Sequence, residues 1–264
     1  MRRPAGEAQV LVVGVYPSAL HVAWSPPPFL DRRSTTERSR PHIGALAVDV
    51  EPVVFWDGRE PSAETKVNEW REEVGFDPAL HGAIRAARNG PSGSGLTDTL
   101  GALGLSPDSV ALTDAVPWFF VKAGKGSQGE AQRERFAPRA REMGVDVGRL
   151  PERPSTSALV RLAMLDRPSP LAGEIVDAGA PVVVTLGQEA LDAVRAVADR
   201  SVGLPDRLGA EGYGKLGEIN IAGHQLAVLP LVNPGFERQT KRPEWLEALE
   251  SWRAGAIRIL RGSA

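Results

Sequence analysis

A short apolar run, Val10–Val13, stops at Gly14. Consecutive β-branched and aliphatic residues that end at a turn predict a buried strand. Gly14 allows close approach of the backbone, and Pro17 fixes its own φ and disfavours helix at the residue before it. We therefore expect a strand that ends in a tight loop, 14–18, at the sheet edge where open α/β sheets bind ligands. The same pattern also fits an ordinary strand-to-loop turn.

Three later apolar runs predict further strands, over 109–116, 181–186 and 224–231. Amphipathic or capped patterns predict helices over 63–74, 78–87, 96–103, 158–165, 171–178, 189–198 and 243–260. One or two short elements are expected within 42–55, and a flexible turn over 90–95. Strands that alternate with helices predict the α/β class, with a mostly parallel sheet covered on both faces. No linker is evident, so we expect one domain over 1–264.

Composition narrows the classes of function. The chain has 264 residues and no cysteine, which excludes disulfides, zinc–thiolate sites and cysteine-ligated iron–sulfur clusters. The net charge of −2 gives no global nucleic-acid signature, although a local basic patch remains open. No run approaches the roughly 20 apolar residues of a membrane span, and the run before Gly14 is too short for a signal peptide. We expect a soluble, cytoplasmic protein with no membrane partner.

Common cofactor motifs are also missing. The four histidines show no metal-ligand spacing, and none pairs with a nearby carboxylate in a known motif. The dipeptide Gly124-Lys125 lacks the earlier glycines of a phosphate-binding loop, and no G-x-G-x-x-G follows a strand. We therefore expect no metal and no cofactor. No feature of the sequence indicates an oligomeric state.

Four segments stand in order, and each is a predicted strand that runs into a loop at the same edge of the sheet. They are V-V-G-V-Y-P at 12–17, L-T-D-A-V-P at 112–117, V-V-T-L-G-Q-E-A at 183–190 and L-P-L-V-N-P-G at 229–235. Their order and spacing resemble the uracil-DNA glycosylase superfamily over most of the chain. The resemblance implies a three-layer α/β/α fold and hydrolysis of the N-glycosidic bond of a flipped base in DNA. In that family the first loop positions water, the second reads the base, the third is structural and the last contacts base and minor groove.

The resemblance also implies the site residues. Tyr16 and Asn233 occupy the catalytic positions of the first and last loops. The residues at substrate-binding positions are Gly14, Pro17, Phe29, Asp114 and Pro234, with Phe29 stacked on the flipped base. Four residues after the last loop are at DNA-binding positions, with an apolar wedge at Phe236 and phosphate contacts at Arg238, Lys241 and Arg242.

Three positions depart from the family pattern. Tyr16 stands where the family has a carboxylate or an amide, and a phenol with an ordinary pKa of about 10 is a poor base at neutral pH. Asp114 stands where an asparagine would read the base, and an ionised Asp only accepts hydrogen bonds. Gly235 replaces a serine. Two hypotheses follow: a cofactor-free glycosidic hydrolase, and a catalytically inactive relative that binds DNA or another partner through the same cleft.

Overall fold

The computed structural model describes residues 1–25, 27, 42–56, 62–86, 91–122, 124, 130, 134, 137–142, 144–145, 151–165 and 171–261. The contacts within the chain divide it into two compact units. Unit 1 consists of Met1–Pro17, Gly90–Pro117 and Ser155–Ala264, and unit 2 consists of Ser18–Asn89 and Trp118–Pro154. That both units form one domain over 1–264 stays a prediction.

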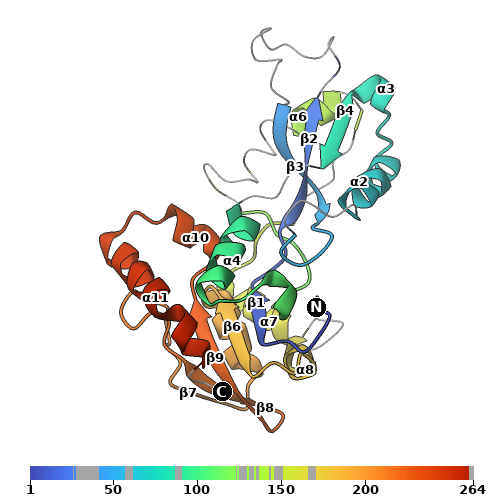
Figure 1. Ribbon diagram of the computed structural model, residues 1–264. Coiled ribbons are helices and arrows are strands. Elements are labelled where there is room, and N and C mark those ends of the chain that lie inside the picture. Colours follow the sequence, from blue (N-terminus) through green and yellow to red (C-terminus); the bar gives the residue numbers. More distant parts are fainter. Residues whose placement is uncertain are drawn as a thin grey trace. The chain divides into compact units, whose positions relative to one another are not determined.

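Unit 1 is built on a six-stranded, mostly parallel sheet (Figure 1). Its parallel strands are β1 (Val10–Gly14), β5 (Val110–Asp114), β6 (Val182–Leu186) and β9 (His224–Leu231). The order is β5-β1-β6-β9-β8-β7, where β8 (Gly217–Ile221) and β7 (Arg200–Val202) pair in antiparallel fashion. The predicted α/β class with a mostly parallel sheet is therefore confirmed.

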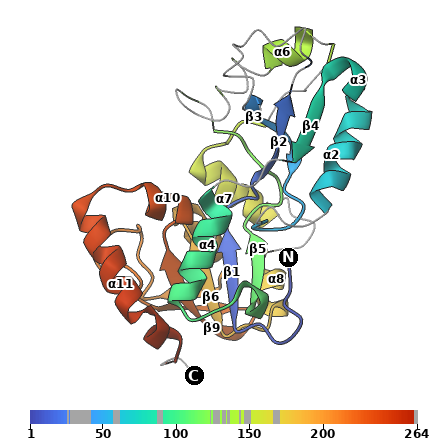
Figure 2. The ribbon, with the colours of Figure 1, turned by 45° about the horizontal axis from the view of Figure 1, so that its top comes forward.

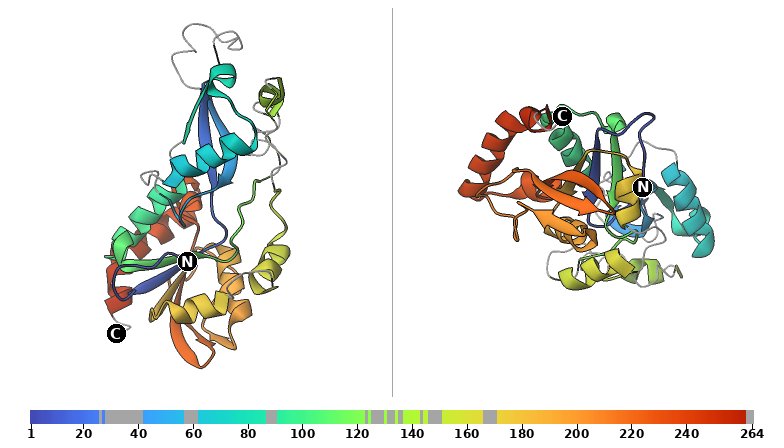
Figure 3. Two further views of the ribbon diagram at one scale, coloured as in Figure 1. Left: turned by 90° about the vertical axis from the view of Figure 1, so that its right-hand side faces the viewer. Right: turned by 90° about the horizontal axis from the view of Figure 1, so that it is seen from below.

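Helices pack against the sheet of unit 1 as two groups. In one group α9 (Gln188–Val197) contacts α7 (Thr156–Leu165) and α8 (Leu171–Asp177). In the other, α4 (Pro91–Ala102) contacts α10 (Pro234–Gln239) and α11 (Pro243–Arg261). Figures 2 and 3 show the groups on opposite faces of the sheet. Because helices cover both faces of the sheet, β1, β5 and β6 are buried at every position. A sheet between two groups of helices is compatible with a three-layer α/β/α arrangement.

The start of α4 differs from the sequence prediction. We expected a turn over 90–95, but α4 begins at Pro91. A Cβ atom on Gly95 would lie 2.7 Å from the Cβ of Pro234, so only glycine lets α4 approach α10 this closely. Packing in the folded chain thus outweighs the low helix propensity of this glycine- and serine-rich segment.

Unit 2 contains a three-stranded antiparallel sheet of order β3-β2-β4. Its elements are β2 (Ala19–Ser25), β3 (His42–Val50), β4 (Ala83–Ala86), α2 (Ser62–Glu73), α3 (Pro78–His81) and α6 (Ala137–Glu142). Trp24, Trp56 and Trp70 belong to its core. The predicted helix over 78–87 is wrong beyond His81, because Gly82 adopts a φ of +89° and the chain continues as a strand.

Membrane insertion was not expected from the sequence. Among the residues that the structure describes, no helix combines the length and the apolar character of a membrane span.

Candidate functional site

The four parallel strands of unit 1 deliver their loops to one edge of the sheet, which we call the carboxyl edge. In the register, Gly14 pairs with Asp114, and Leu186 pairs with Leu231. Since β1, β5, β6 and β9 are neighbours and run the same way, the loops that follow them emerge side by side. The expectation that the loops after β1, β5 and β9 share one end of a parallel sheet is confirmed.

The first and second loops are joined by their main chains. The N–H of Ala115 donates to the carbonyl of Gly14 at 2.8 Å, and that of Val116 donates to the carbonyl of Val15 at 3.1 Å. The pairing of β1 with β5 therefore continues into both loops. It fixes the backbone next to Tyr16, whose side chain is half-buried, and next to Asp114.

Asp114 is a buried acid at the end of β5, with only 6% of its surface exposed. Burial removes water from a carboxylate and is costly unless other groups compensate, so acids are rarely buried this deeply. Pro17, in the first loop, is buried as well. The buried side chains of the carboxyl edge thus include an acid and a proline beside aliphatic residues such as Val116.

Gly187 marks the point where three elements converge. Its φ is +100°, a backbone conformation that favours glycine, and its N–H donates to the carbonyl of Leu231 at 2.7 Å. A Cβ atom on Gly187 would lie 3.8 Å from Val15 Cγ2, 3.8 Å from Asn233 Cβ and 3.9 Å from Glu189 Oε2. The first loop, the last loop and α9 therefore meet at this corner.

The last loop is shaped by the N-terminus of α10. Asn233 is the N-cap residue, and its Oδ1 accepts a hydrogen bond from the N–H of Gly235 at 2.8 Å. Pro234 follows in the first turn, where its missing N–H costs nothing. Asn233 is exposed and Pro234 is buried, so the amide lies at the surface of the edge while the proline packs beneath it.

Aromatic side chains support this loop from within unit 1. The N–H of Val232 donates to the hydroxyl of Tyr213 at 3.2 Å. The Tyr213 ring makes edge-on contacts with Trp245 and Trp252 at centroid distances of 5.5 and 5.8 Å. Burial raises the pKa of Tyr213 well above its ordinary value, so the hydroxyl remains protonated at neutral pH.

The short helix α10 presents an exposed aromatic ring. Phe236 is 37% exposed and packs edge-on against Trp245 at 5.2 Å. The neighbouring Glu237 side chain is only 5% exposed, accepts from Arg253 Nε at 3.0 Å and accepts from Thr99 Oγ1 at 3.2 Å. These bonds attach α10 to α11 and α4, which holds Phe236 at the surface.

The remaining predicted DNA contacts lie close to α10 in the chain. Lys241 and Arg242 are exposed between α10 and α11, and Arg238 lies within α10. Phe29, the predicted stacking residue, lies outside the described residues.

Sequence reasoning missed Glu189, because the third segment seemed structural only. Glu189 lies in the first turn of α9, and its Oε1 accepts a hydrogen bond from Thr156 Oγ1 at 3.3 Å. The signal was present in the sequence: an acidic residue just after a buried parallel strand and a glycine lies where such sheets bind ligands. The carboxyl edge therefore carries two acids, Asp114 and Glu189.

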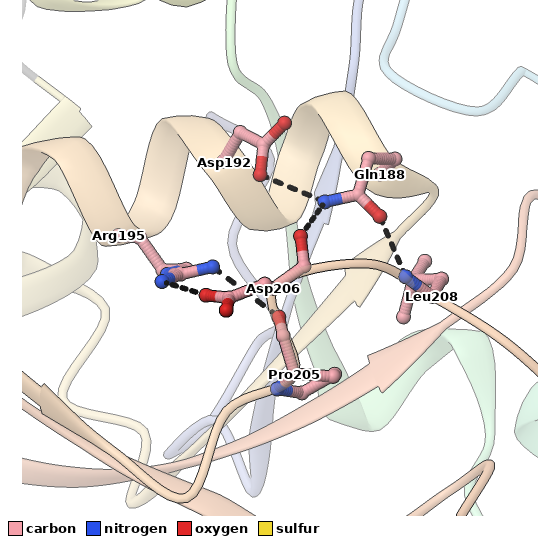
Figure 4. Close-up of polar contacts among 6 residues, drawn as sticks. All are labelled: Gln188, Asp192, Arg195, Pro205, Asp206 and Leu208. Carbon is pink, nitrogen blue, oxygen red and sulfur yellow. Dashed lines mark hydrogen bonds and ion pairs between the residues drawn. The ribbon is translucent and has the colours of Figure 1, made fainter. Parts of the chain in front are cut away.

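The adjacent residue, Gln188, fixes the first turn of α9 (Figure 4). Its Nε2 donates to Asp192 Oδ1 at 2.8 Å and to the carbonyl of Asp206 at 3.1 Å, and its Oε1 accepts from the N–H of Leu208 at 2.7 Å. Arg195 Nη2 also binds Asp206 Oδ1 at 2.9 Å. This face of α9 is thus bound to the 205–208 loop, and the helix start beside Gly187 is held in place.

Helix N-termini gather at the carboxyl edge. The start of α9 follows β6 directly, α7 starts at Thr156 beside Glu189, and the first turns of α4 pack on Pro234. Helix N-termini carry partial positive charge and point N–H groups outward. The edge therefore favours anionic groups, including ionised carboxylates and negatively charged ligands.

Comparison with known proteins does not assign a family to the chain. Within the described ranges, no group of three or more histidine, aspartate or glutamate side chains is placed to hold a metal ion. No protein-family model and no curated protein matches the chain.

Proposed function

We propose that the protein binds DNA and holds a flipped base at the carboxyl edge of unit 1, where the N-glycosidic bond is hydrolysed without a cofactor. One observation carries this proposal. The four segments that resemble the uracil-DNA glycosylase superfamily lie on four neighbouring parallel strands, so their loops share an edge. We also infer that the three layers form a uracil-DNA-glycosylase-like fold.

The residues take distinct roles in this proposal. Asp114 accepts hydrogen bonds from a base face that presents donors. Asn233, exposed at the start of α10, contacts the base and the attacking water. Phe236 inserts as an apolar wedge, which helps to extrude the nucleotide.

The electrostatics of the edge suit this reaction. When the glycosidic bond breaks, its electron pair leaves with the base, so negative charge develops there. Fixed dipoles aimed at developing charge stabilise a transition state without reorganisation. The N-termini of α4, α7 and α9 supply such dipoles at the carboxyl edge.

A second candidate function is DNA binding without catalysis. Tyr16 favours it, because this half-buried phenol stands where the resembled family has an acid or an amide. In that case the same edge receives DNA or another partner, and Tyr16 occupies the space of the attacking water. The two candidates share the binding surface and differ only in chemistry.

The test uses the full chain and oligonucleotides that carry uracil, hypoxanthine or xanthine, in single- and double-stranded form. Released base and abasic sites are measured together with DNA affinity, and an unmodified oligonucleotide is the control. Base release that falls strongly in Asn233→Ala supports hydrolysis. DNA binding without release of any base selects the second candidate. A chain that neither binds DNA nor releases a base overturns both hydrolysis and DNA binding.

A further inference from the structure

We infer that Glu189 is the general base of this reaction: its carboxylate takes a proton from the water that attacks the sugar. The inference rests on the proposed function, since it names the proton acceptor which hydrolysis at the carboxyl edge needs. Tyr16 cannot fill this role at neutral pH, because an ordinary phenol is protonated there. A carboxylate at the same corner can.

The position of Glu189 carries the argument. Its Oε2 lies 3.9 Å from the Cβ position of Gly187, and Val15 Cγ2 and Asn233 Cβ each lie 3.8 Å from the same point. The carboxylate therefore reaches the Gly187 corner, where the first and last loops meet, although it comes from α9. Because Gly187 has no side chain, no side-chain atom of residue 187 lies between this carboxylate and the two loops.

Thr156 orients this carboxylate. Its Oγ1 donates to Glu189 Oε1 at 3.3 Å, while Oε2 is the oxygen that lies beside Gly187. Glu189 lies in the first turn of α9, where the partial positive charge of the helix N-terminus attracts an acidic side chain. One oxygen is thus held by a hydroxyl, and the other lies at the corner where water would be activated.

Asp114 and Glu189 are separated by a strand, which suits a division of roles. In the sheet order β1 lies between β5 and β6, so the strands that end at Asp114 and before Glu189 are about 10 Å apart. A nucleotide bound over β1 would have one carboxylate on the side of the base and the other on the side of the water. Two acids with separate tasks are a common solution in hydrolases.

The proposed step balances as a simple hydrolysis. The water oxygen forms a bond to the anomeric carbon, the carbon–nitrogen bond breaks, and its electron pair leaves with the base. The Glu189 carboxylate takes the water proton and releases it to the departing base or to solvent. The products are an abasic sugar with a hydroxyl group and the free base, and no oxidant or reductant is consumed.

The experiment compares Glu189→Gln, Glu189→Ala and Glu189→Asp with the parent on the oligonucleotide that it cleaves best. Removing general-base help lowers the rate by roughly 10²–10⁴-fold, so we expect kcat to fall by that range in Glu189→Gln while DNA affinity changes little. Glu189→Asp should retain part of the activity, and added formate should restore activity to Glu189→Ala. Glu250→Gln, an exposed acid on α11, is the matched control.

Each outcome decides the inference. Undiminished kcat in Glu189→Gln, with an active parent, overturns the role of Glu189 and leaves the proposed function standing. A loss that formate does not rescue, together with a lower unfolding midpoint, shows a structural role and also overturns it. A parent that releases no base overturns the inference together with the proposed function. A kcat loss at unchanged stability, reversed by formate, supports it.

Discussion

The side chain of Val15 lies 3.8 Å from the position that a Cβ atom would take on Gly187. This contact joins the loop after β1 to the turn after β6. The carbonyl of Val15 meanwhile accepts from the N–H of Val116 in the loop after β5. One residue therefore links three loops of the carboxyl edge, to one through its carbonyl and to another through its side chain, and the side-chain contact depends on the backbone at Gly187.

Gly187→Ala should test this dependence on the backbone. Neighbours at 3.8–3.9 Å are ordinary contacts, so the cost comes from the φ of +100°. We expect the free energy of unfolding to fall by about 1–3 kcal/mol in urea titrations. Gly173→Ala is the control, because Gly173 lies within α8 with open space around it, and alanine should stabilise a helix there. Equal effects of both substitutions would contradict the argument.

Two substitutions of Asn233 should separate its structural role as the N-cap of α10 from its proposed role in base release. Asn233→Ala removes the N-cap of α10 and should lower the free energy of unfolding by about 1 kcal/mol. Asn233→Asp keeps the acceptor for the N–H of Gly235 and should keep stability. It also loses the amide donors, so base release should fall. Unfolding curves and the base-release assay check the two roles, and a destabilised Asn233→Asp would refute the separation.

The basic residues around α10 should control DNA affinity. Replacing Arg238, Lys241 and Arg242 together with Ala should weaken binding and flatten its salt dependence by up to about three charges. Fluorescence anisotropy at several salt concentrations measures both effects. The control replaces three exposed arginines elsewhere in unit 1, Arg200, Arg207 and Arg258. If the control loses as much affinity, binding is not localised at α10.

Tyr16 should limit the reaction. A tyrosine ring is larger than an acid or an amide and would crowd the water that Glu189 activates, so we expect uracil release by the parent to be very slow. Tyr16→Asp or Tyr16→Asn should create or raise that activity, provided that Asp114 still admits the base. Robust release by the parent, undiminished in Tyr16→Phe, would show that Tyr16 neither blocks nor assists.

His21, on β2 of unit 2, should make stability depend on pH. Burial lowers the pKa of His21 below its ordinary value of 6.5. The unfolded chain then binds this proton at a higher pH than the folded chain, so the free energy of unfolding should decrease as the pH falls through about 6.5. Urea titrations between pH 5 and 8 measure the slope. His21→Gln should reduce it, and an unchanged slope would exclude His21 as a cause.

The parallel strands were predictable because burial on both faces requires continuous apolar runs, as in Val10–Val13 and 181–186. The strand β8 was missed for the opposite reason. Buried and more exposed residues alternate along Gly217–Ile221. This alternation spans only a few residues between a loop and a turn, so in the sequence the strand resembles a surface segment. The early start of α4 was missed because it depends on the contact of Gly95 with Pro234, which joins residues far apart in the chain.

The site was predictable in part. Segment order alone indicated that Gly14, Asp114 and Asn233 lie at or just after the ends of strands with a common edge, and the register agrees. The sequence also places Glu189 just after a strand of this edge, but its position at the Gly187 corner could not be read in the same way. That position depends on the φ of Gly187 and on the bond from Thr156, and neither is visible in a local pattern.

The hydrogen bond from Val232 to Tyr213 has a consequence for contacts between molecules. Along β9 the carbonyl of Leu231 faces β6, so the alternate positions Pro230 and Val232 face the side of β8. Pairing with β8 extends only to Val228. Beyond it Pro230 has no N–H to offer, and the N–H of Val232 is bound by the phenol. This flank of β9 therefore gives an incoming strand no donor to pair with, which guards the protein against edge-to-edge aggregation beside the loops of the carboxyl edge.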